Sequence, residues 1–282
     1  VPYASRWRRA MSDDRDDATL SRDIAREAGQ LLLQMRREFY DEHAAPVDKQ
    51  TANRLRDAAD ARSNDLILER LHAARPQDSV LSEEAKDDDS RLSAERVWIV
   101  DPLDGTWEYG QNRRDFAVHI ALWAEGELRA CTVDLPAQDI TRSVLDAVTP
   151  IALPTDRPLR LVASRSRPPA TLESTREALE RIVRQAKVND FGVEIIDVGS
   201  VGAKVGEILA GRADAYLHDT GFYEWDVAAP YGVAAHYGLR AAHIDGSPVT
   251  FNHMPPYVED LVVAHSELYP YLRQALAEAS GS

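Results

Sequence analysis

Cysteine is almost absent from this chain of 282 residues, because Cys131 is the only one. A single cysteine excludes a disulfide bond within the chain and the cysteine clusters of structural zinc sites. Long apolar runs are missing too, since nowhere do about 18 apolar residues follow one another, the length that a membrane-spanning helix needs. Residues 1–9 lack the apolar stretch of a signal peptide. We therefore expect a cytoplasmic protein that is neither exported nor inserted in a membrane.

Positive charge is also scarce, because 33 lysines and arginines stand against 47 aspartates and glutamates, a formal net charge of -14. Like charges repel at long range, which excludes a nucleic-acid backbone or an anionic membrane surface as the main partner. Hydrophobic residues still make up 44% of the chain, enough for a sizeable core. Met11 is a candidate start of the natural chain, and we expect residues 1–11 to be a disordered or non-native extension.

The order of the expected helices and strands changes near the middle of the chain. In the first half we expect helices packed on an antiparallel sheet, with elements at about residues 17–40, 58–74, 97–100 and 116–135. From about residue 159 strands and helices alternate, which favours a more parallel α/β arrangement. We expect one compact catalytic unit made of an α+β half, residues 12–155, and an α/β half, residues 156–282.

Acidic residues gather in three short clusters, each beside an expected strand or helix. The segment Asp101-Pro102-Leu103-Asp104-Gly105 ends a buried strand, and its glycine permits a turn that brings the two carboxylates together. The same five residues also fit an ordinary turn. The other clusters are Glu83-Glu84 and Glu224-Trp225-Asp226. Because hard cations such as Mg²⁺ prefer carboxylate oxygens, we expect the three clusters to form one metal site.

Together the clusters resemble the signature of the inositol monophosphatase superfamily of lithium-sensitive, Mg²⁺-dependent phosphatases. That signature is a strand followed by Asp-Pro-Ile/Leu-Asp-Gly-Thr/Ser, with Glu-Glu upstream and Trp-Asp-x-Ala downstream, and residues 98–106, 83–84 and 225–228 match it. The similarity runs from about Leu20 to the last helix. It implies an αβαβα layered sandwich of the α+β / α/β class, as in inositol monophosphatase and fructose-1,6-bisphosphatase. It also implies two or three Mg²⁺ ions and a homodimer.

The resemblance assigns roles to residues that match the signature by position. It implies that Asp60 and Thr106 are catalytic and orient and deprotonate a metal-bound water. Around Asp60 the chain departs from the family's usual Asp-x-Val-Thr-x-Ala-Asp, and an aspartate that only caps a helix is the alternative. Glu84 would be an acid that supports the metal ligands from behind. The implied metal ligands are Glu83, Asp101, the Leu103 carbonyl, Asp104 and Asp226.

Further residues resemble the CysQ-like 3'(2'),5'-bisphosphate nucleotidases within the superfamily. Glu108 and Glu224 match acids of that branch, and residues 163–167 resemble its Ser-Arg-Ser-His segment. Two arginines suit a second phosphate, although a solvated basic loop is the alternative. Val201, His218 and Trp107 depart from the branch pattern. The implied substrate contacts are Gly105, Thr106, Arg165, Arg167, Ser200, Lys204, His218 and Asp219.

The resemblance implies a phosphoric monoester hydrolase that removes the 3'-phosphate of adenosine 3',5'-bisphosphate and leaves AMP. The alternatives are phosphatases for inositol monophosphate, fructose 1,6-bisphosphate or a specialised sugar or nucleoside phosphate. A catalytically silent protein that binds a nucleotide or metal is a different class, and loss of Asp60 or Asp104 would be its mark; both are present. His119 lies in an expected strand with Ala117 and Ala121 on one face, and we interpret it as a sheet histidine.

Overall fold

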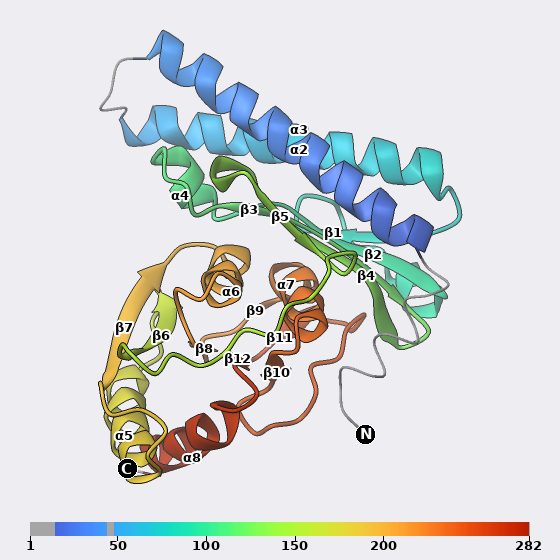
Figure 1. Ribbon diagram of the computed structural model, residues 1–282. Helices are drawn as coiled ribbons and strands as arrows, with labels where there is room; N and C mark the ends of the chain where they lie inside the picture. The colour runs from blue at the N-terminus through green and yellow to red at the C-terminus, as the bar shows by residue number, and fades with distance from the viewer. Residues whose placement is uncertain (1–14, 44–47, 282) are drawn as a thin grey trace.

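Helices and sheets alternate in five layers in the computed structural model of the chain, which describes residues 15–43 and 48–281 (Figure 1). The expectation for residues 1–11 lies outside the described residues. The helices are α2 (Arg15–Glu42), α3 (Lys49–Ala74), α4 (Thr106–Gly110), α5 (Leu172–Gln185), α6 (Val201–Leu209), α7 (Glu224–His236) and α8 (Tyr269–Ser280), with two 3-10 helices, η1 (Asp89–Ser93) and η2 (Pro136–Gln138). The predicted αβαβα layered sandwich is confirmed.

The first sheet has the strand order β1-β2-β3-β4-β5, in which β1 and β2 are parallel and the others antiparallel. Its strands are β1 (Ser79–Ser82), β2 (Arg96–Asp104), β3 (Ala117–Ala124), β4 (Glu127–Leu135) and β5 (Ile140–Ser143). Glu125 and Gly126 join β3 to β4 with φ angles of 53° and 84°. Positive φ at both positions is typical of a tight hairpin turn, and the predicted hairpin is confirmed.

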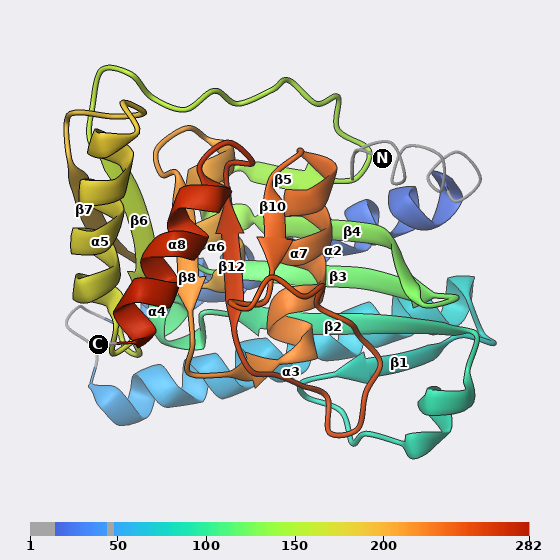
Figure 2. The same ribbon diagram turned by 90° about the horizontal axis from the view of Figure 1, so that it is seen from below.

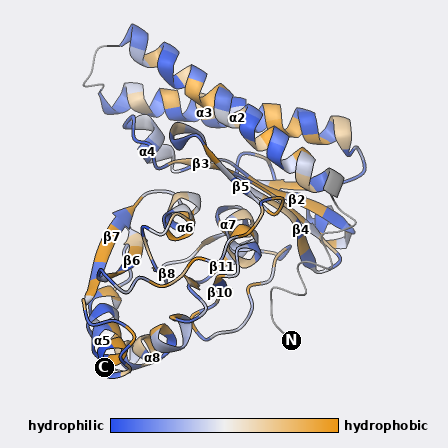
Figure 3. Cartoon of the chain, viewed as in Figure 1, coloured by the Kyte–Doolittle hydropathy of each residue, from blue (hydrophilic) through white to orange (hydrophobic). Residues whose placement is uncertain are grey.

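Both faces of the first sheet are covered, which explains the continuous apolar run in β2. Helices α2 and α3 pack on one face, and α6 and α7 pack on the other (Figures 1 and 2). Every β2 residue from Val97 to Asp104 is buried. Helix α2 alternates hydrophilic and hydrophobic residues along its length (Figure 3), as expected for a helix with one face on the sheet.

The second sheet has the order β10-β12-β8-β6-β7, in which β7, β6 and β8 are parallel and β12 pairs antiparallel with both β8 and β10. The alternation of strands and helices thus produces a parallel side of the sheet next to an antiparallel one. A small ribbon of β9 (Phe222–Tyr223) and β11 (Tyr257–Val258) stands apart. The strands of the second sheet are β6 (Leu159–Ser164), β7 (Val193–Val198), β8 (Ala215–His218), β10 (Arg240–Ala242) and β12 (Leu261–Ala264).

Helix α3 begins nine residues earlier than the expected start at about residue 58. Asp48 is the N-cap, and its side chain accepts hydrogen bonds from the backbone N–H groups of Gln50 and Thr51. Only Ala52 and Leu55 are buried in the first turns, too sparse a stripe to be recognised in the sequence. Asp60 therefore lies in the middle of α3, so the expectation that it opens the helix is wrong, and it does not cap one.

Helices α6 and α7 contact both sheets, which makes them the central layer of the molecule. None of the helices in the described ranges is long and apolar enough to cross a membrane. The division into halves at residues 155 and 156 stays a prediction.

Candidate active site

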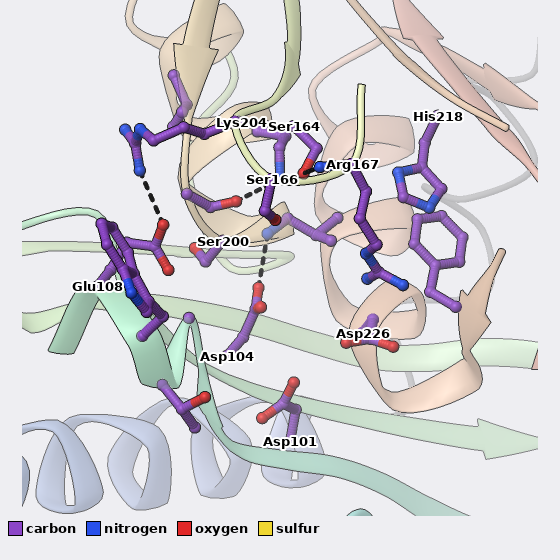
Figure 4. Close-up of a pocket in the computed structure, with 18 of the residues that line it drawn as sticks. Asp101, Asp104, Glu108, Ser164, Ser166, Arg167, Ser200, Lys204, His218 and Asp226 are labelled. Carbon is purple, nitrogen blue, oxygen red and sulfur yellow. Dashed lines mark hydrogen bonds and ion pairs between the residues drawn. The ribbon is translucent and has the colours of Figure 1, made fainter. Parts of the chain in front are cut away.

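A pocket opens where β2 and β6 end and where α6 and α7 begin. Two helix N-termini point into the region, and their backbone N–H groups favour negative charge there. Figure 4 shows Asp101 and Asp104 on one side of the pocket, with Lys204 and Arg167 on the opposite side.

A backbone irregularity brings the first two carboxylates together. In a regular strand, residues three apart point to opposite faces of the sheet. The pairing of β2 with β3 shifts its register between Asp101 and Asp104, as a bulge does. The Leu103 N–H donates to Asp101 Oδ1 at 3.0 Å, and Gly105 follows with a φ of 86°. As a result, ligand atoms of Asp101, Asp104 and His119 lie within 4.8 Å of one another.

The acid wall of the pocket is defined here as Glu83, Asp101, Asp104 and Asp226, all of which line it. Burial and the charge of Glu83 raise the pKa of Asp101 well above its usual range. Burial and Asp104 raise the pKa of Asp226 to about 8. Glu83 lies at the exposed rim of the wall, where partial desolvation and the charge of Asp104 raise its pKa to about 7. These carboxylates therefore repel one another, and the acid wall favours an added positive charge.

Asp60, on α3, is not among the residues that line the pocket, but it is close enough to the acid wall to interact electrostatically with Glu83 and Asp101. Its side chain is 6% exposed, and its Oδ1 atom has no hydrogen-bond partner among the described residues. Burial, then Glu83 and Glu84, raise its pKa to about 8. Glu84 is exposed and does not line the pocket, so its charge acts on Asp60 and Glu83 from outside.

The donor set of the acid wall fits a hard divalent cation. Asp101 Oδ2 is buried and, like Asp60 Oδ1, has no hydrogen-bond partner within residues 15–43 and 48–281. Uncompensated buried carboxylates are costly, and oxygen-ligated cations such as Mg²⁺ compensate them. Arginine or lysine partners, the other means of compensation, contact none of the four acids of this wall at ion-pair distance in the described structure.

The opposite side of the pocket carries the cations, but Arg165 is already engaged. Its guanidinium donates to Glu108 at 2.8 Å and to Asp115 at 3.0 Å. The guanidinium of Arg167 forms no ion pair with any residue that the structure describes, and it lies close enough to Asp226 to lower that residue's pKa. Contact of Arg165 with a phosphate stays a prediction, and two carboxylates compete with it. Arg167 is the better placed of the two arginines.

The start of α6 is built by internal hydrogen bonds. Ser200 is the N-cap, and its hydroxyl accepts from the Ala203 N–H at 2.9 Å. Asp115 accepts from the Gly199 N–H at 2.9 Å through its side chain and from the Ser200 N–H at 3.1 Å through its carbonyl. Lys204 is 3% exposed, donates to the Gly199 carbonyl, and has its pKa lowered by burial to about 8. Both Ser200 and Lys204 line the pocket.

His218 lines the pocket, and its contacts determine which ring nitrogen carries the proton. Its ring stacks on Phe222 at 4.1 Å, and its Nε2 lies 3.1 Å from the Gly221 carbonyl, so Nε2 carries the proton. Burial lowers its pKa to about 4, which leaves the ring neutral. Its Nδ1 has no partner in the described structure and can accept a hydrogen bond from a hydroxyl or amino group. Contact of His218 with a phosphate stays a prediction that this tautomer disfavours, and Asp219 does not line the pocket.

Gly105 and Thr106 line the pocket at the start of α4, and their contact with substrate stays a prediction. A side chain at position 105 would place its Cβ 3.2 Å from Ser200 Cβ, a tight approach, and the φ angle of 86° there also favours glycine. Leu103 also lines the pocket.

Several residues of the site carried no signal in the sequence. Asp115 connects Arg165 to the start of α6, and Tyr216 and Phe222 line the pocket. Glu224 was part of an acidic cluster expected at the metal site, but it accepts hydrogen bonds from the backbone N–H groups of Asn252 and His253, both at 2.7 Å, so it anchors a loop and does not line the pocket. These contacts join segments far apart in the chain, which is why spacing alone does not find them.

The layered fold and the acid wall define a class of protein, the metal-dependent phosphatases of αβαβα architecture. A model of the Inositol monophosphatase family matches residues 13–280. The chain belongs to the inositol monophosphatase family, as its signature predicts. The expected enzyme class, a phosphoric monoester hydrolase, is confirmed with it, and enzymes of this family use Mg²⁺.

Individual relatives carry more specific names. A protein of Mycobacterium tuberculosis named 3'-phosphoadenosine 5'-phosphate phosphatase is 42% identical over 262 residues, covering 90% of each chain. A protein of the same name from Mycobacterium leprae is 41% identical over 288 residues, covering 98% of each. The crystal structure of CysQ from Bacteroides thetaiotaomicron has a TM-score of 0.69 at 24% identity, covering 89% of this chain and 97% of that one. This last likeness concerns the fold.

Proposed function

We propose that this chain is a Mg²⁺-dependent phosphatase that removes the 3'-phosphate of adenosine 3',5'-bisphosphate and releases AMP and inorganic phosphate. The observation that carries the proposal is a single pocket in which the acid wall is opposed by Arg167 and Lys204 (Figure 4). A substrate with two phosphates uses both sides of such a pocket. The two mycobacterial relatives named for this substrate support the choice.

The acid wall would hold two or three Mg²⁺ ions, with the Leu103 carbonyl as an additional ligand. Bound Mg²⁺ would neutralise the negative charge of the phosphate and lower the pKa of a bound water. The raised pKa values of the acids support this assignment, since each carboxylate lacks a positive partner of its own.

Asp60 and Thr106 would prepare the attacking water. The unpartnered Oδ1 of Asp60 accepts the water proton, and the Thr106 hydroxyl orients the oxygen. The water oxygen then bonds to phosphorus, the bond from phosphorus to the 3'-oxygen breaks, and a proton is delivered to that oxygen. No covalent enzyme intermediate is needed.

The remaining contacts would select the substrate. Arg167 forms charge-assisted hydrogen bonds with the second phosphate, assisted by Lys204 and the Ser200 turn at the start of α6. His218 accepts a hydrogen bond from a hydroxyl or amino group of the nucleoside through Nδ1. In this assignment Arg165 holds Glu108 and Asp115 in place. Glu84 and Asp219 lie outside the pocket and do not contact the substrate.

A cytoplasmic location and a homodimer also belong to the proposal. The buried free thiol of Cys131 is consistent with a reducing compartment. Sedimentation analysis of the purified chain would test the dimer.

The test is phosphate release from adenosine 3',5'-bisphosphate, AMP, inositol 1-phosphate and fructose 1,6-bisphosphate, with Mg²⁺ and with EDTA. We expect a strong preference for the bisphosphate nucleotide and no activity in EDTA or in Asp104→Asn. Preference for another ester would refute the nucleotide assignment and leave the phosphatase intact. Failure to cleave any ester, together with tight nucleotide binding, would favour the silent binding protein.

A further inference from the structure

Arg165 connects two segments that carry different parts of the proposed site. It directly follows β6 and stands two residues before Arg167 on the same loop. Its Nη1 atom donates to Glu108 Oε1 at 2.8 Å, a contact drawn as a dashed line in Figure 4. Glu108 stands two residues after Thr106 on α4. One ion pair therefore joins the loop of Arg167 to the helix of Thr106.

The same guanidinium makes a second bond, which ties this ion pair to the start of α6. Arg165 Nη2 donates to Asp115 Oδ2 at 3.0 Å, and the Gly199 N–H donates to the same oxygen at 2.9 Å. A Cβ at position 199 would lie 2.8 Å from the Asp115 carbonyl oxygen, so this close approach requires glycine. Four segments around the pocket thus meet at Arg165.

Direct binding of a phosphate by Arg165 is the alternative, and its contacts disfavour it. Two nitrogens of the planar guanidinium already face carboxylates, an arrangement that suits the fork of an arginine. A phosphate would have to replace one of these carboxylates or lie beside both, and like charges repel. Arg167 needs no such exchange, because its guanidinium forms no ion pair with the described part of the chain.

We propose that Arg165 is a positioning residue that sets the distance between the reaction centre and the site of the second phosphate. By holding Glu108 and Asp115 it fixes the loop of Arg167 relative to Thr106 and the start of α6. A substrate is then selected by the spacing of its two phosphates, and Arg165 itself does not touch it. The inference rests on the proposed function, because it needs a second phosphate that binds at Arg167.

Substitutions of the two acids separate positioning from direct binding, because the two roles predict changes of opposite sign. Glu108→Gln removes a carboxylate from Arg165, and Asp115→Asn is a second variant of the same kind. If Arg165 bound the phosphate, its release would lower KM for adenosine 3',5'-bisphosphate. If Arg165 positions the loop, its release raises KM. Adenosine 3'-phosphate, which lacks the second phosphate, is the comparison substrate.

Asp214→Asn is the matched control. Asp214 accepts from Nη1 and Nη2 of Arg157 at 2.8 and 3.0 Å just before β6, and neither residue lines the pocket. The side chain of Arg157 is 21% exposed and that of Arg165 is 26% exposed, so the two arginines are similarly buried. This control shows what the loss of an ion pair does to the fold alone. Melting temperatures are measured for every variant.

We expect a KM for adenosine 3',5'-bisphosphate about tenfold higher in Glu108→Gln and in Asp115→Asn, with less than about threefold change for adenosine 3'-phosphate. The control should lower the melting temperature and leave KM unchanged. A lower KM in either acid variant would show that Arg165 binds phosphate, and an unchanged KM would show a merely structural contact. Either result would overturn the proposal.

Failure of the proposed function gives a different result. If the unaltered chain cleaves both nucleotides with equal kcat/KM, or cleaves neither, there is no productive site for a second phosphate. In that case the substrate assignment is wrong, whatever the variants do.

Discussion

The two sides of the pocket differ in how completely their polar groups are satisfied. The acid wall is under-compensated: its carboxylates have raised pKa values and at least one buried oxygen without a partner. On the other side, Arg165, Lys204 and Ser200 are already hydrogen-bonded within the protein. The first side requires added cations before it is electrostatically stable, and the second is largely formed before any substrate arrives.

This difference explains why the acid wall could be predicted from the sequence and the opposite side could not. Binding several cations requires acids at fixed positions, and these acids form the sequence motifs Glu83-Glu84, Asp101 to Asp104, and Asp226. The opposite side depends on which of several arginines is left free, a property of the folded structure. We therefore expect substitutions of the acid wall to abolish activity for every substrate, and substitutions opposite it to change the choice of substrate.

The largest effect is expected for Asp226→Asn. The substitution keeps the size of the side chain but removes a charge from the acid wall, so phosphate release should fall by at least about 100-fold for the bisphosphate nucleotide and for any weaker substrate. Steady-state kinetics at saturating Mg²⁺ measure it. Asp219→Asn is the control, because this neighbouring aspartate does not line the pocket. A comparable loss of activity in Asp219→Asn would contradict the special requirement for the acids of the acid wall.

An intermediate effect, restricted to one substrate, is expected for Arg167→Gln. Loss of a charge-assisted hydrogen bond to the second phosphate costs about 1.5 to 3 kcal/mol, or roughly 10 to 100-fold in kcat/KM for adenosine 3',5'-bisphosphate. Activity on a substrate with one phosphate should change by less than about threefold. If both substrates lose activity equally, Arg167 serves the reaction centre and does not select the second phosphate.

The smallest effect concerns stability and needs no substrate. A carboxyl group whose pKa is higher in the folded chain than in the unfolded one binds its proton more tightly when folded, so stability is lost as the pH rises through that pKa. For Asp60 and Asp226, whose pKa is raised from 3.8 to about 8, stability is lost progressively as the pH rises from about 4, and the loss is complete above about pH 8. In EDTA the melting temperature should fall by at least about 3 °C between about pH 6 and about pH 9.

Added Mg²⁺ should remove most of that pH dependence, because positive charge lowers the pKa of each acid again. Differential scanning calorimetry at several pH values, with Mg²⁺ and with EDTA, makes the comparison. A melting temperature in EDTA that rises with pH over this range would show that the acid wall is compensated within the protein.

Much of the fold follows from local patterns in the sequence. The apolar run of β2, the Glu125-Gly126 turn and the alternation after residue 159 each depend on neighbours in the chain, and all three are found as predicted. The start of α3 was missed because its first turns bury little. Within the site, the contacts of Asp115 depend on partners on other elements, so no spacing in the sequence indicates them.

The first turn of α7 contains two acids, one with a structural contact and one at the pocket. Glu224 holds the backbone of Asn252 and His253 inside the protein, while Asp226, two residues later, lines the pocket. Each residue added to a helix rotates the later side chains by about 100° around the helix axis. Substitutions can thus accumulate around this turn during evolution, but a single inserted residue would rotate one acid out of place, so homologous chains should vary here in composition and never in length.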